Sequence, residues 1–234
     1  MRYRFDLHCH SFYSADAADA PEDLIAKAKA RGLSGIAITD HDSCEVHKYL
    51  REKGLERADG QPVDGFLVVP GVEVSTADGH LLCIGALLPK LQGQPAAAVA
   101  AAIHDVGGIA IPAHPYDRWR SGICTEVLDT MDIHAIEVFN AAVSSRKYND
   151  HAADYATKRG LSMTAASDAH HASAIGVSCT AFEMDELSVP ALLAAIRRGG
   201  TPEGRYLSFA EALKKHFGNF FRAANKRPLP RIDT

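Results

Sequence analysis

The sequence lacks a long uninterrupted run of apolar residues. Its N-terminus, MRYRFDLHCH, has no basic stretch followed by an extended apolar region, so we expect no secretory signal. None of the apolar runs reaches the length that a membrane-spanning helix needs. The sequence therefore predicts no contact with a membrane, and it shows no surface that predicts a protein partner.

Cysteine is scarce, and its spacing follows no known framework. The five cysteines are scattered, odd in number and without a C-x-x-C pair. This pattern argues against a disulfide scaffold and against a structural zinc knuckle. A reducing compartment fits such free thiols best, so we expect a cytoplasmic protein.

The chain also lacks internal repeats, low-complexity blocks and linkers. Its 234 residues are 47% hydrophobic and 23% charged, which is ordinary for one globular domain and matches the size of many single α/β barrels. The net charge is −4, yet residues 197–234 hold nine Lys and Arg against three Asp and Glu. We expect a single barrel domain over residues 1–204 and a basic C-terminal segment over residues 205–234 that is helical and partly ordered.

What the sequence does contain is an alternation of short apolar strands and helical segments. The strand-like runs are YRFDLHC, SGIAITD, FLVVPGVEVS, HLLCIGALL, GIAIPA, HAIEVFN, LSMTAAS and IGVSCTAF. The helical segments begin at Pro or Ser and end at Gly: PEDLIAKAKARG, PAAAVAAAIHDVGG, SSRKYNDHAADYATKRG and SVPALLAAIRRGG. This alternation favours parallel β/α units, and a barrel of such units places active groups at the carboxyl ends of its strands.

Polar residues gather where the apolar strands give way to loops. His8 and His10 are one residue apart, so an extended strand directs both imidazoles to the same side. Other strand ends carry Asp40, His41, Asp42, Glu73, His114, Asp168, His170 and His171. A core histidine or a capping aspartate explains any one of these, but five such strand ends together indicate a metal site.

His80 stands at the start of a strand, which sets it apart from the other histidines of this pattern. The Ala-Asp-Gly sequence before it predicts a tight hairpin after the strand that holds Glu73. Such a hairpin returns His80 to the edge of the barrel where the Glu73 strand ends. The sequence therefore predicts that both residues belong to one site.

Six motifs between His8 and about Phe182 carry a resemblance to a known family. They are HCH, the nearby Asp16, TDHD, PGVEVS with His80, AHP and SDAH. In this order they resemble the PHP (polymerase and histidinol phosphatase) family of metal-dependent phosphoesterases, and within it the TrpH-like branch. The resemblance implies an α/β fold, a distorted (β/α)7 TIM-like barrel, with three divalent metal ions per chain: zinc, manganese or iron.

The resemblance also implies which residues bind these ions. It gives His8, His10, Glu73 and Asp168 to a first metal, and Glu73 bridges to a second metal that His80 and His114 hold. The third metal falls to Asp16, His41 and His170. In this family a hydroxide that bridges two metals attacks the phosphate, so no serine or cysteine nucleophile is required.

Three further residues are candidates for catalysis. Asp40 flanks His41, where it either orients an imidazole, shuttles a proton or caps the following helix. Arg118 and Arg120 follow His114, and guanidinium groups match phosphate oxygens, so this loop is the predicted phosphate clamp. The alternative is a solvated loop that Trp119 anchors by packing against the protein.

The expected function is hydrolysis of a phosphate ester, with a nucleotide as the phosphorylated small-molecule substrate and a short oligonucleotide as a second possibility. Longer members of the branch insert a helical segment between the equivalents of His80 and His114. Here only a short strand and one alanine-rich helix separate them, so we expect a site open to bulkier esters. The alternatives are an amidohydrolase-like metal-dependent hydrolase and a catalytically silent metal-binding regulatory module.

Overall fold

The computed structural model describes residues 1–208 of the chain. The strands are β1 (Arg2–Cys9), β2 (Gly35–Ile38), β3 (Leu67–Val69), β4 (Gly71–Ser75), β5 (His80–Ile84), β6 (Ile109–Pro112), β7 (Ala135–Asn140), β8 (Ser162–Ala166), β9 (Ser178–Glu183) and β10 (Thr201–Gly204). The helices are α1 (Pro21–Ala30), α2 (Glu45–Glu52), α3 (Ala96–Asp105), α4 (Thr125–Leu128), α5 (Arg146–Arg159) and α6 (Val189–Arg198), with short 3-10 turns η1 (Arg118–Arg120) and η2 (Ala172–Ala174). Most of the predicted basic C-terminal segment, residues 209–234, lies outside the described residues.

The strands form three hydrogen-bonded sheets with both parallel and antiparallel pairs. β1, β2 and β3 pair in parallel, as do β7 and β8. β4, β5 and β6 are antiparallel, and β9 pairs antiparallel with both β1 and β10. The fold is therefore of the predicted α/β class, and all four predicted helices are present as α1, α3, α5 and α6.

The predicted single strand FLVVPGVEVS is wrong, because it is two strands that belong to different sheets. Pro70 lies between β3 and β4 and has no N–H to donate to a strand ladder. Its carbonyl accepts a hydrogen bond of 2.7 Å from the backbone N–H of Gly85 instead. The chain thus leaves the parallel sheet at Pro70 and begins the antiparallel β4–β5 hairpin.

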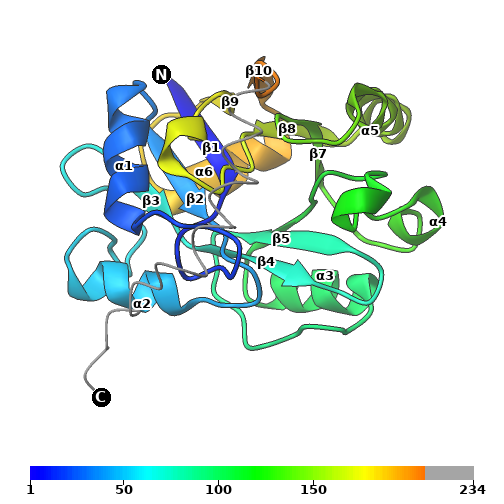
Figure 1. Ribbon diagram of the computed structural model, residues 1–234, viewed down its shortest axis with the longest axis horizontal. Coiled ribbons are helices and arrows are strands. Elements are labelled where there is room, and N and C mark those ends of the chain that lie inside the picture. Colours follow the sequence, from blue (N-terminus) through cyan, green and yellow to red (C-terminus); the bar gives the residue numbers. More distant parts are fainter. Residues whose placement is uncertain (209–234) are drawn as a thin grey trace.

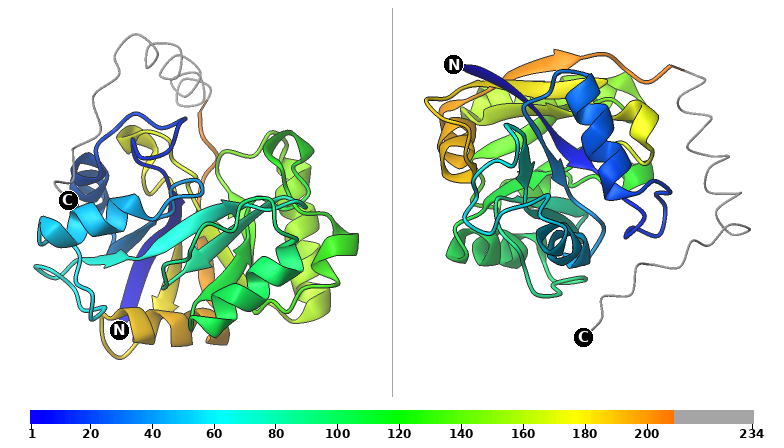
Figure 2. Two further views of the ribbon diagram at one scale, coloured as in Figure 1. Left: turned by 90° about the horizontal axis from the view of Figure 1, so that it is seen from below. Right: turned by 90° about the vertical axis from the view of Figure 1, so that its left-hand side faces the viewer.

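The three sheets form a distorted barrel (Figures 1 and 2), and the carboxyl ends of the parallel strands β1, β2 and β3 lie at the same end of it as the start of β5. Isolated parallel bridges join His41 to Glu73 and Cys9 to Ala169, which links β2 to β4 and β1 to the end of β8. β6 and β7 lie against one another at the remaining junction. The sheets are thus joined where the polar residues of the sequence pattern gather.

The opposite end of the barrel is filled by apolar side chains. Phe5 and Leu7 of β1 pack in one cluster with Leu192 and Ile196 of α6. Figure 2 shows α6 at the same end of the molecule as the N-terminus, at the start of β1. Because this end is occupied by core packing, chemistry is confined to the carboxyl end. Among the described residues, no helix is long and apolar enough to cross a membrane.

A buried histidine fixes α2 to the strands that lead into the polar end. His47 is fully buried, and its Nδ1 lies 2.6 Å from Glu56 Oε2. Its Nε2 lies 3.0 Å from the carbonyl of Ile38 and 2.9 Å from that of Gly71. Arg51 Nε donates to the second oxygen of Glu56 over 2.8 Å. This network therefore ties α2 to β2 and β4.

We expect His47→Ala to lower the free energy of unfolding by about 2–4 kcal/mol, because it leaves a buried carboxylate without one partner. Urea denaturation of the purified variant measures this loss. Lys48→Ala, at the exposed neighbouring position, is the matched control and should change the value by no more than about 0.5 kcal/mol. Equal stability of the two variants would contradict the structural role of His47.

Candidate metal centre

The carboxylate of Glu73 is the centre of the polar cluster. It is fully buried on β4. Its Oε2 lies 3.0 Å from His8 Nε2, 3.1 Å from His10 Nε2 and 3.4 Å from His41 Nδ1. One oxygen atom therefore faces imidazoles from the ends of two parallel strands, β1 and β2.

The second oxygen of Glu73 faces the other side of the barrel. Its Oε1 lies 2.8 Å from His80 Nδ1 and 3.2 Å from His114 Nε2. The hairpin register pairs Ser75 with His80, so the predicted return of His80 to the end of the Glu73 strand is confirmed. His114 follows β6, which is the third strand of the same antiparallel sheet.

Asp16 and Asp168 complete the cluster on the side of β1 and β8. Asp168 Oδ1 lies 3.5 Å from His10 Nε2 and 3.7 Å from His8 Nε2. Asp16 Oδ2 lies 2.8 Å from the Nε2 of His170. The loop that follows β1 therefore brings Asp16 back toward the strand ends.

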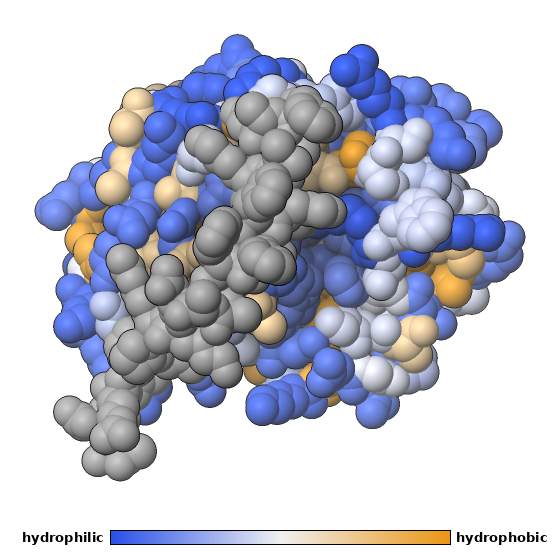
Figure 3. Space-filling view, in the orientation of Figure 1, coloured by the Kyte–Doolittle hydropathy of each residue, from blue (hydrophilic) through white to orange (hydrophobic). Residues whose placement is uncertain are grey.

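The structure thus brings together all nine residues that the family resemblance names. They lie at the carboxyl end of the barrel, on the face shown in Figure 3, where a hydrophilic hollow is visible. Two of them, His114 and Asp168, adopt positive φ angles of 32° and 51°, which side chains other than glycine rarely accept. Such strain is typical of functional sites, where the surrounding structure holds it in place.

The charges of the cluster shift the pKa values of its members in opposite directions. Burial alone would raise the pKa of Glu73, but the imidazoles of His8 and His41 hold it well below its ordinary range. Burial would lower the pKa of His10, yet the facing carboxylates of Asp168 and Glu73 raise it to about 9. The cluster therefore requires positive charge beside its carboxylates.

The donor set fits divalent metal ions. His10 Nε2, His41 Nδ1 and His80 Nδ1 are buried ring nitrogens with no hydrogen-bond partner, although each faces an oxygen of Glu73 at 2.8–3.4 Å. Ligands about 2.0–2.2 Å from a zinc ion in tetrahedral geometry are themselves about 3.3 Å apart. Nitrogen and oxygen atoms at these separations, without hydrogen bonds between them, have the spacing that metal ligands would have.

Asp40 supports the cluster from behind. It is fully buried, its Oδ1 accepts hydrogen bonds from Ser11 N and Ser14 Oγ, both 2.7 Å long, and burial raises its pKa. Because the Ser14 hydroxyl donates to Asp40, it accepts from Nδ1 of His10 over 3.2 Å. This fixes the tautomer of His10 and leaves its Nε2 lone pair for a ligand bond. Among the roles considered for Asp40, these contacts fit the one in which it orients an imidazole, that of His10.

Glu137 plays the same part for His8. Nδ1 of His8 lies 3.2 Å from Glu137 Oε1, while Glu137 Oε2 accepts from the backbone N–H of His114 over 2.7 Å and from Asn140 Nδ2 over 2.9 Å. A carboxylate behind a metal-binding histidine is a recurrent arrangement. The signal for Glu137 in the sequence is the polar pair Glu137 and Asn140 in EVFN at the end of β7.

The two arginines of the predicted phosphate clamp differ in their contacts and exposure. Arg120 Nη1 lies 2.6 Å from Asp168 Oδ2, and its side chain is only 17% exposed. Arg118 is exposed. Trp119 between them is 86% exposed, so the alternative in which it anchors the loop by packing is wrong.

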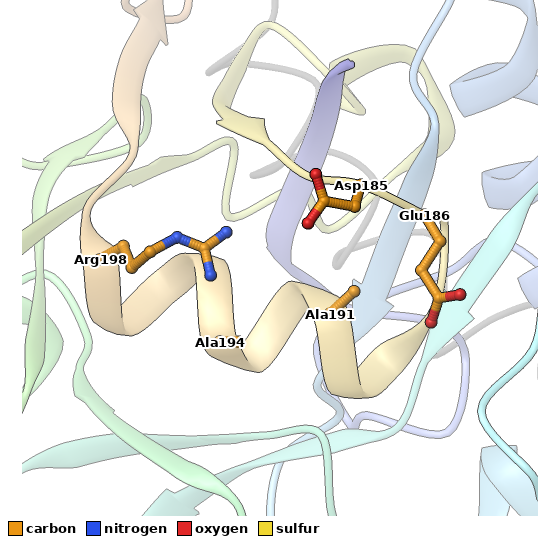
Figure 4. Close-up of a pocket in the computed structure, with 5 residues that line it drawn as sticks. All are labelled: Asp185, Glu186, Ala191, Ala194 and Arg198. Atoms are coloured by element: carbon orange, nitrogen blue, oxygen red, sulfur yellow. The ribbon is translucent and has the colours of Figure 1, made fainter.

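A second hollow lies on the surface beside α6. It is lined by Asp185, Glu186, Ala191, Ala194 and Arg198 (Figure 4). Its charged groups are of both signs, and histidine and cysteine are absent from its lining within the described residues. It lies at the end of the barrel opposite to the histidine cluster, so it is no part of this site.

Comparison with known proteins agrees with the geometry of the site. Residues 6–118 match the family model described as the PHP domain, and residues 146–201 match that described as PHP-associated. An uncharacterized protein of Methanocaldococcus jannaschii is 30% identical over 152 residues, which cover 58% of this chain and 81% of that protein. A protein of Enterobacter sp. named a probable phosphatase is 33% identical over 93 residues, which cover 38% of each chain.

The fold is also shared with a solved structure, the lesion-specific endonuclease PfuEndoQ of Pyrococcus furiosus. The match has a TM-score of 0.67 at 19% identity and covers 87% of this chain but 57% of the endonuclease. The chain thus spans little more than half of that enzyme and 38% of the probable phosphatase. Together the two family models show that the chain belongs to the PHP domain family.

Proposed function

We propose that the protein hydrolyses the phosphate ester of a nucleotide or a short oligonucleotide. The observation that carries this proposal is the cluster of nine predicted ligand residues with Arg120 beside it. Eight of the nine belong to groups whose ligand atoms lie within 4.8 Å of one another, and the ninth, Asp16, lies 2.8 Å from His170. Imidazole and carboxylate groups supply metal ligands, and a guanidinium group supplies a partner for phosphate oxygens. The probable phosphatase and the endonuclease named above support phosphate esters as the substrate class.

The three-metal arrangement implied by the family resemblance is part of this proposal. His8, His10 and Glu73 form one group whose ligand atoms are mutually within 4.8 Å, and His10, His41 and His170 form another. Two further groups join His41 with Glu73 and His80, and His8 with His114 and Asp168, so that the four groups share residues. Divalent ions held there would activate water at neutral pH and neutralise charge on the phosphoryl group.

The chain's own residues orient the reacting groups. Glu73 holds five imidazoles in place through its two oxygens, while Asp40, through Ser14, and Glu137 fix the ring orientations of His10 and His8. Arg120, already close to Asp168, is placed to bind a phosphate oxygen beside the ligands. Arg118, which is exposed, is assigned to a neighbouring phosphate on the substrate side.

The shape of the site supports a substrate larger than a simple phosphomonoester. The connection from β5 to β6 runs through α3, which packs in a cluster with the outer faces of these strands and not across the histidines. A nucleotide or a chain end would thus reach the ligands from the open side. Five free cysteines, three of them buried, are consistent with the proposed cytoplasmic location.

The two alternative functions have less support. Asp168, a predicted ligand, is paired with Arg120, a phosphate-binding side chain, which an amidohydrolase-like reaction at a C–N bond does not call for. A silent metal-binding module would tolerate losses among the ligands, whereas all nine positions hold side chains suited to metal. Phosphoester hydrolysis therefore accounts for more of the site than either alternative.

The first prediction concerns metal content. Protein purified without chelator should carry more than one and up to three transition-metal ions per chain, measured by plasma mass spectrometry. Asp16→Ala should lower this number by about one, because it removes a ligand from a single group. Asp23→Ala, an exposed acidic position on α1, is the control and should leave it unchanged. An active preparation with at most one bound ion would refute the three-metal arrangement.

The second prediction concerns pH and the metal-free protein. Because the pKa of His10 is raised to about 9 in the folded chain, its protonation stabilises the fold fully below pH 6.5, and this stability is lost as the pH rises through about 9. Metal binding requires neutral imidazole, so metal affinity should rise over the same interval.

Thermal denaturation between pH 6 and 9.5 tests this, with chelated and metal-loaded samples compared at each pH. The chelated protein should lose stability with rising pH, and the difference between the two samples should widen. His10→Asn removes the titrating group and should flatten the dependence. A chelated wild-type protein that is equally stable at pH 6.5 and 9.5 would contradict the assignment.

The third prediction concerns the chemistry. Glu73→Gln and His114→Gln should each lower phosphoester hydrolysis by more than about a hundredfold while the protein stays folded, because each disturbs the shared ligand cluster. His134→Ala, an exposed histidine outside the cluster, should retain full activity. Release of phosphate from a panel of mononucleotides, bisphosphonucleotides and short oligonucleotides provides the measurement. A phosphoenzyme trapped on serine or cysteine would exclude this mechanism.

A further inference from the structure

The single tryptophan of the chain is exposed and directly precedes Arg120, which contacts Asp168 of the metal-ligand cluster. Trp119 is the only tryptophan among the 234 residues, and 86% of its surface is exposed. Tryptophan is highly buried on average, because its large ring gains most from leaving water. An indole held almost entirely in solvent next to a catalytic centre therefore requires a reason other than core packing.

The backbone that presents Trp119 is firmly held. The buried carboxylate of Asp117 accepts hydrogen bonds from Trp119 N over 3.2 Å, from Ser144 N over 2.7 Å and from Ser144 Oγ over 2.6 Å. At Gly122 a Cβ atom would stand 2.4 Å from the carbonyl oxygen of His114, so the chain passes too close for any side chain. The backbone of the turn η1 is thus held by contacts before and after it, and the exposed ring of Trp119 extends from this fixed backbone.

The residues that follow Trp119 in the same turn contact the metal-ligand cluster. Arg120, the next residue, reaches Asp168 with its Nη1 atom 2.6 Å from Oδ2, and the carbonyl of Ser121 accepts from the backbone N–H of His80 over 2.8 Å. Consecutive Cα atoms are about 3.8 Å apart, so the backbone of Trp119 directly adjoins the residue whose side chain reaches Asp168.

We propose that Trp119 stacks on the base of the substrate, and so selects phosphate esters in which the nucleotide that bears the scissile phosphate carries the aromatic base. This inference rests on the proposed phosphoesterase function and names the part of the substrate that the metal cluster does not contact. In this proposal Arg120 binds the phosphate and Trp119 stacks on the base. Two neighbouring residues of one turn would thus contact the two ends of a nucleotide. Stacking of this kind tolerates every base, because each has a π-face.

The direct test uses the fluorescence of Trp119, which reports from this one position because the chain has no other tryptophan. The metal-loaded protein is titrated with the non-hydrolysable methylene-phosphonate analogue of AMP and, separately, with ribose 5-phosphate. The base-bearing analogue should quench the emission with saturation, and ribose 5-phosphate should not. Equal quenching by both compounds, or quenching by neither while the analogue inhibits hydrolysis, would overturn the assignment.

Steady-state kinetics give the second test. Trp119→Leu should raise KM for a nucleotide by about tenfold or more and leave kcat nearly unchanged, since stacking is worth on the order of a tenfold to hundredfold change in affinity. Trp119→Phe keeps an aromatic plane and should restore most of the loss. Val106→Ala, at an exposed apolar position on the C-cap of α3, is the control. KM for ribose 5-phosphate should be the same in all four proteins.

Failure of this inference is distinguishable from failure of the proposed function. The protein could hydrolyse phosphate esters with and without a base equally well, with both rates unchanged in Trp119→Leu. This result would support the phosphoesterase function and contradict the stacking role. If no phosphate ester is hydrolysed by the metal-loaded protein, both fall. A concentration-dependent dimer in sedimentation that Trp119→Leu dissolves would assign the ring to self-association and overturn the stacking role.

Discussion

The structure of the active end depends on one buried carboxylate. Glu73 is fully buried, and its two oxygens face imidazoles from five different positions of the chain. A charge of this kind is stable away from water only when opposite charges or ions surround it. The ends of β1, β2, β5 and β6 therefore converge on β4, and the arrangement that satisfies Glu73 is also the one that assembles a set of metal ligands.

This constraint links the fold to the site. The three sheets are not joined by continuous ladders, and the bridges that close the barrel include the one between His41 and Glu73. Two more contacts at this edge, Asp168 N to the carbonyl of His8 and His10 N to the carbonyl of Ala169, also involve predicted ligands or their neighbours. Folding and ligand assembly thus share the same backbone segments, while the apolar cluster with α6 stabilises the other end.

The sequence predicted those features that depend on short spacing. The two histidines one residue apart on β1, the hairpin that returns His80 and the helices bounded by Pro, Ser and Gly all follow from local rules. It did not predict the break of the strand at Pro70, because either a single strand or two satisfies the apolar pattern. Nor did the sequence predict that Glu73 lies between five imidazoles, that Arg120 pairs with Asp168 or that Trp119 is exposed. Those outcomes depend on contacts between residues distant in sequence, on which spacing carries no information.

The ion pair between Arg120 and Asp168 has a consequence for the order of events at the site. Asp168 Oδ2 accepts from Asn140 Nδ2 over 3.0 Å as well as facing Arg120, while its Oδ1 faces the histidines. If the proposed function holds, a phosphate that engaged Arg120 would draw positive charge away from Asp168 and so strengthen that carboxylate as a ligand for a neighbouring cation. Substrate binding and cation binding would then be thermodynamically coupled, because each would raise the affinity for the other.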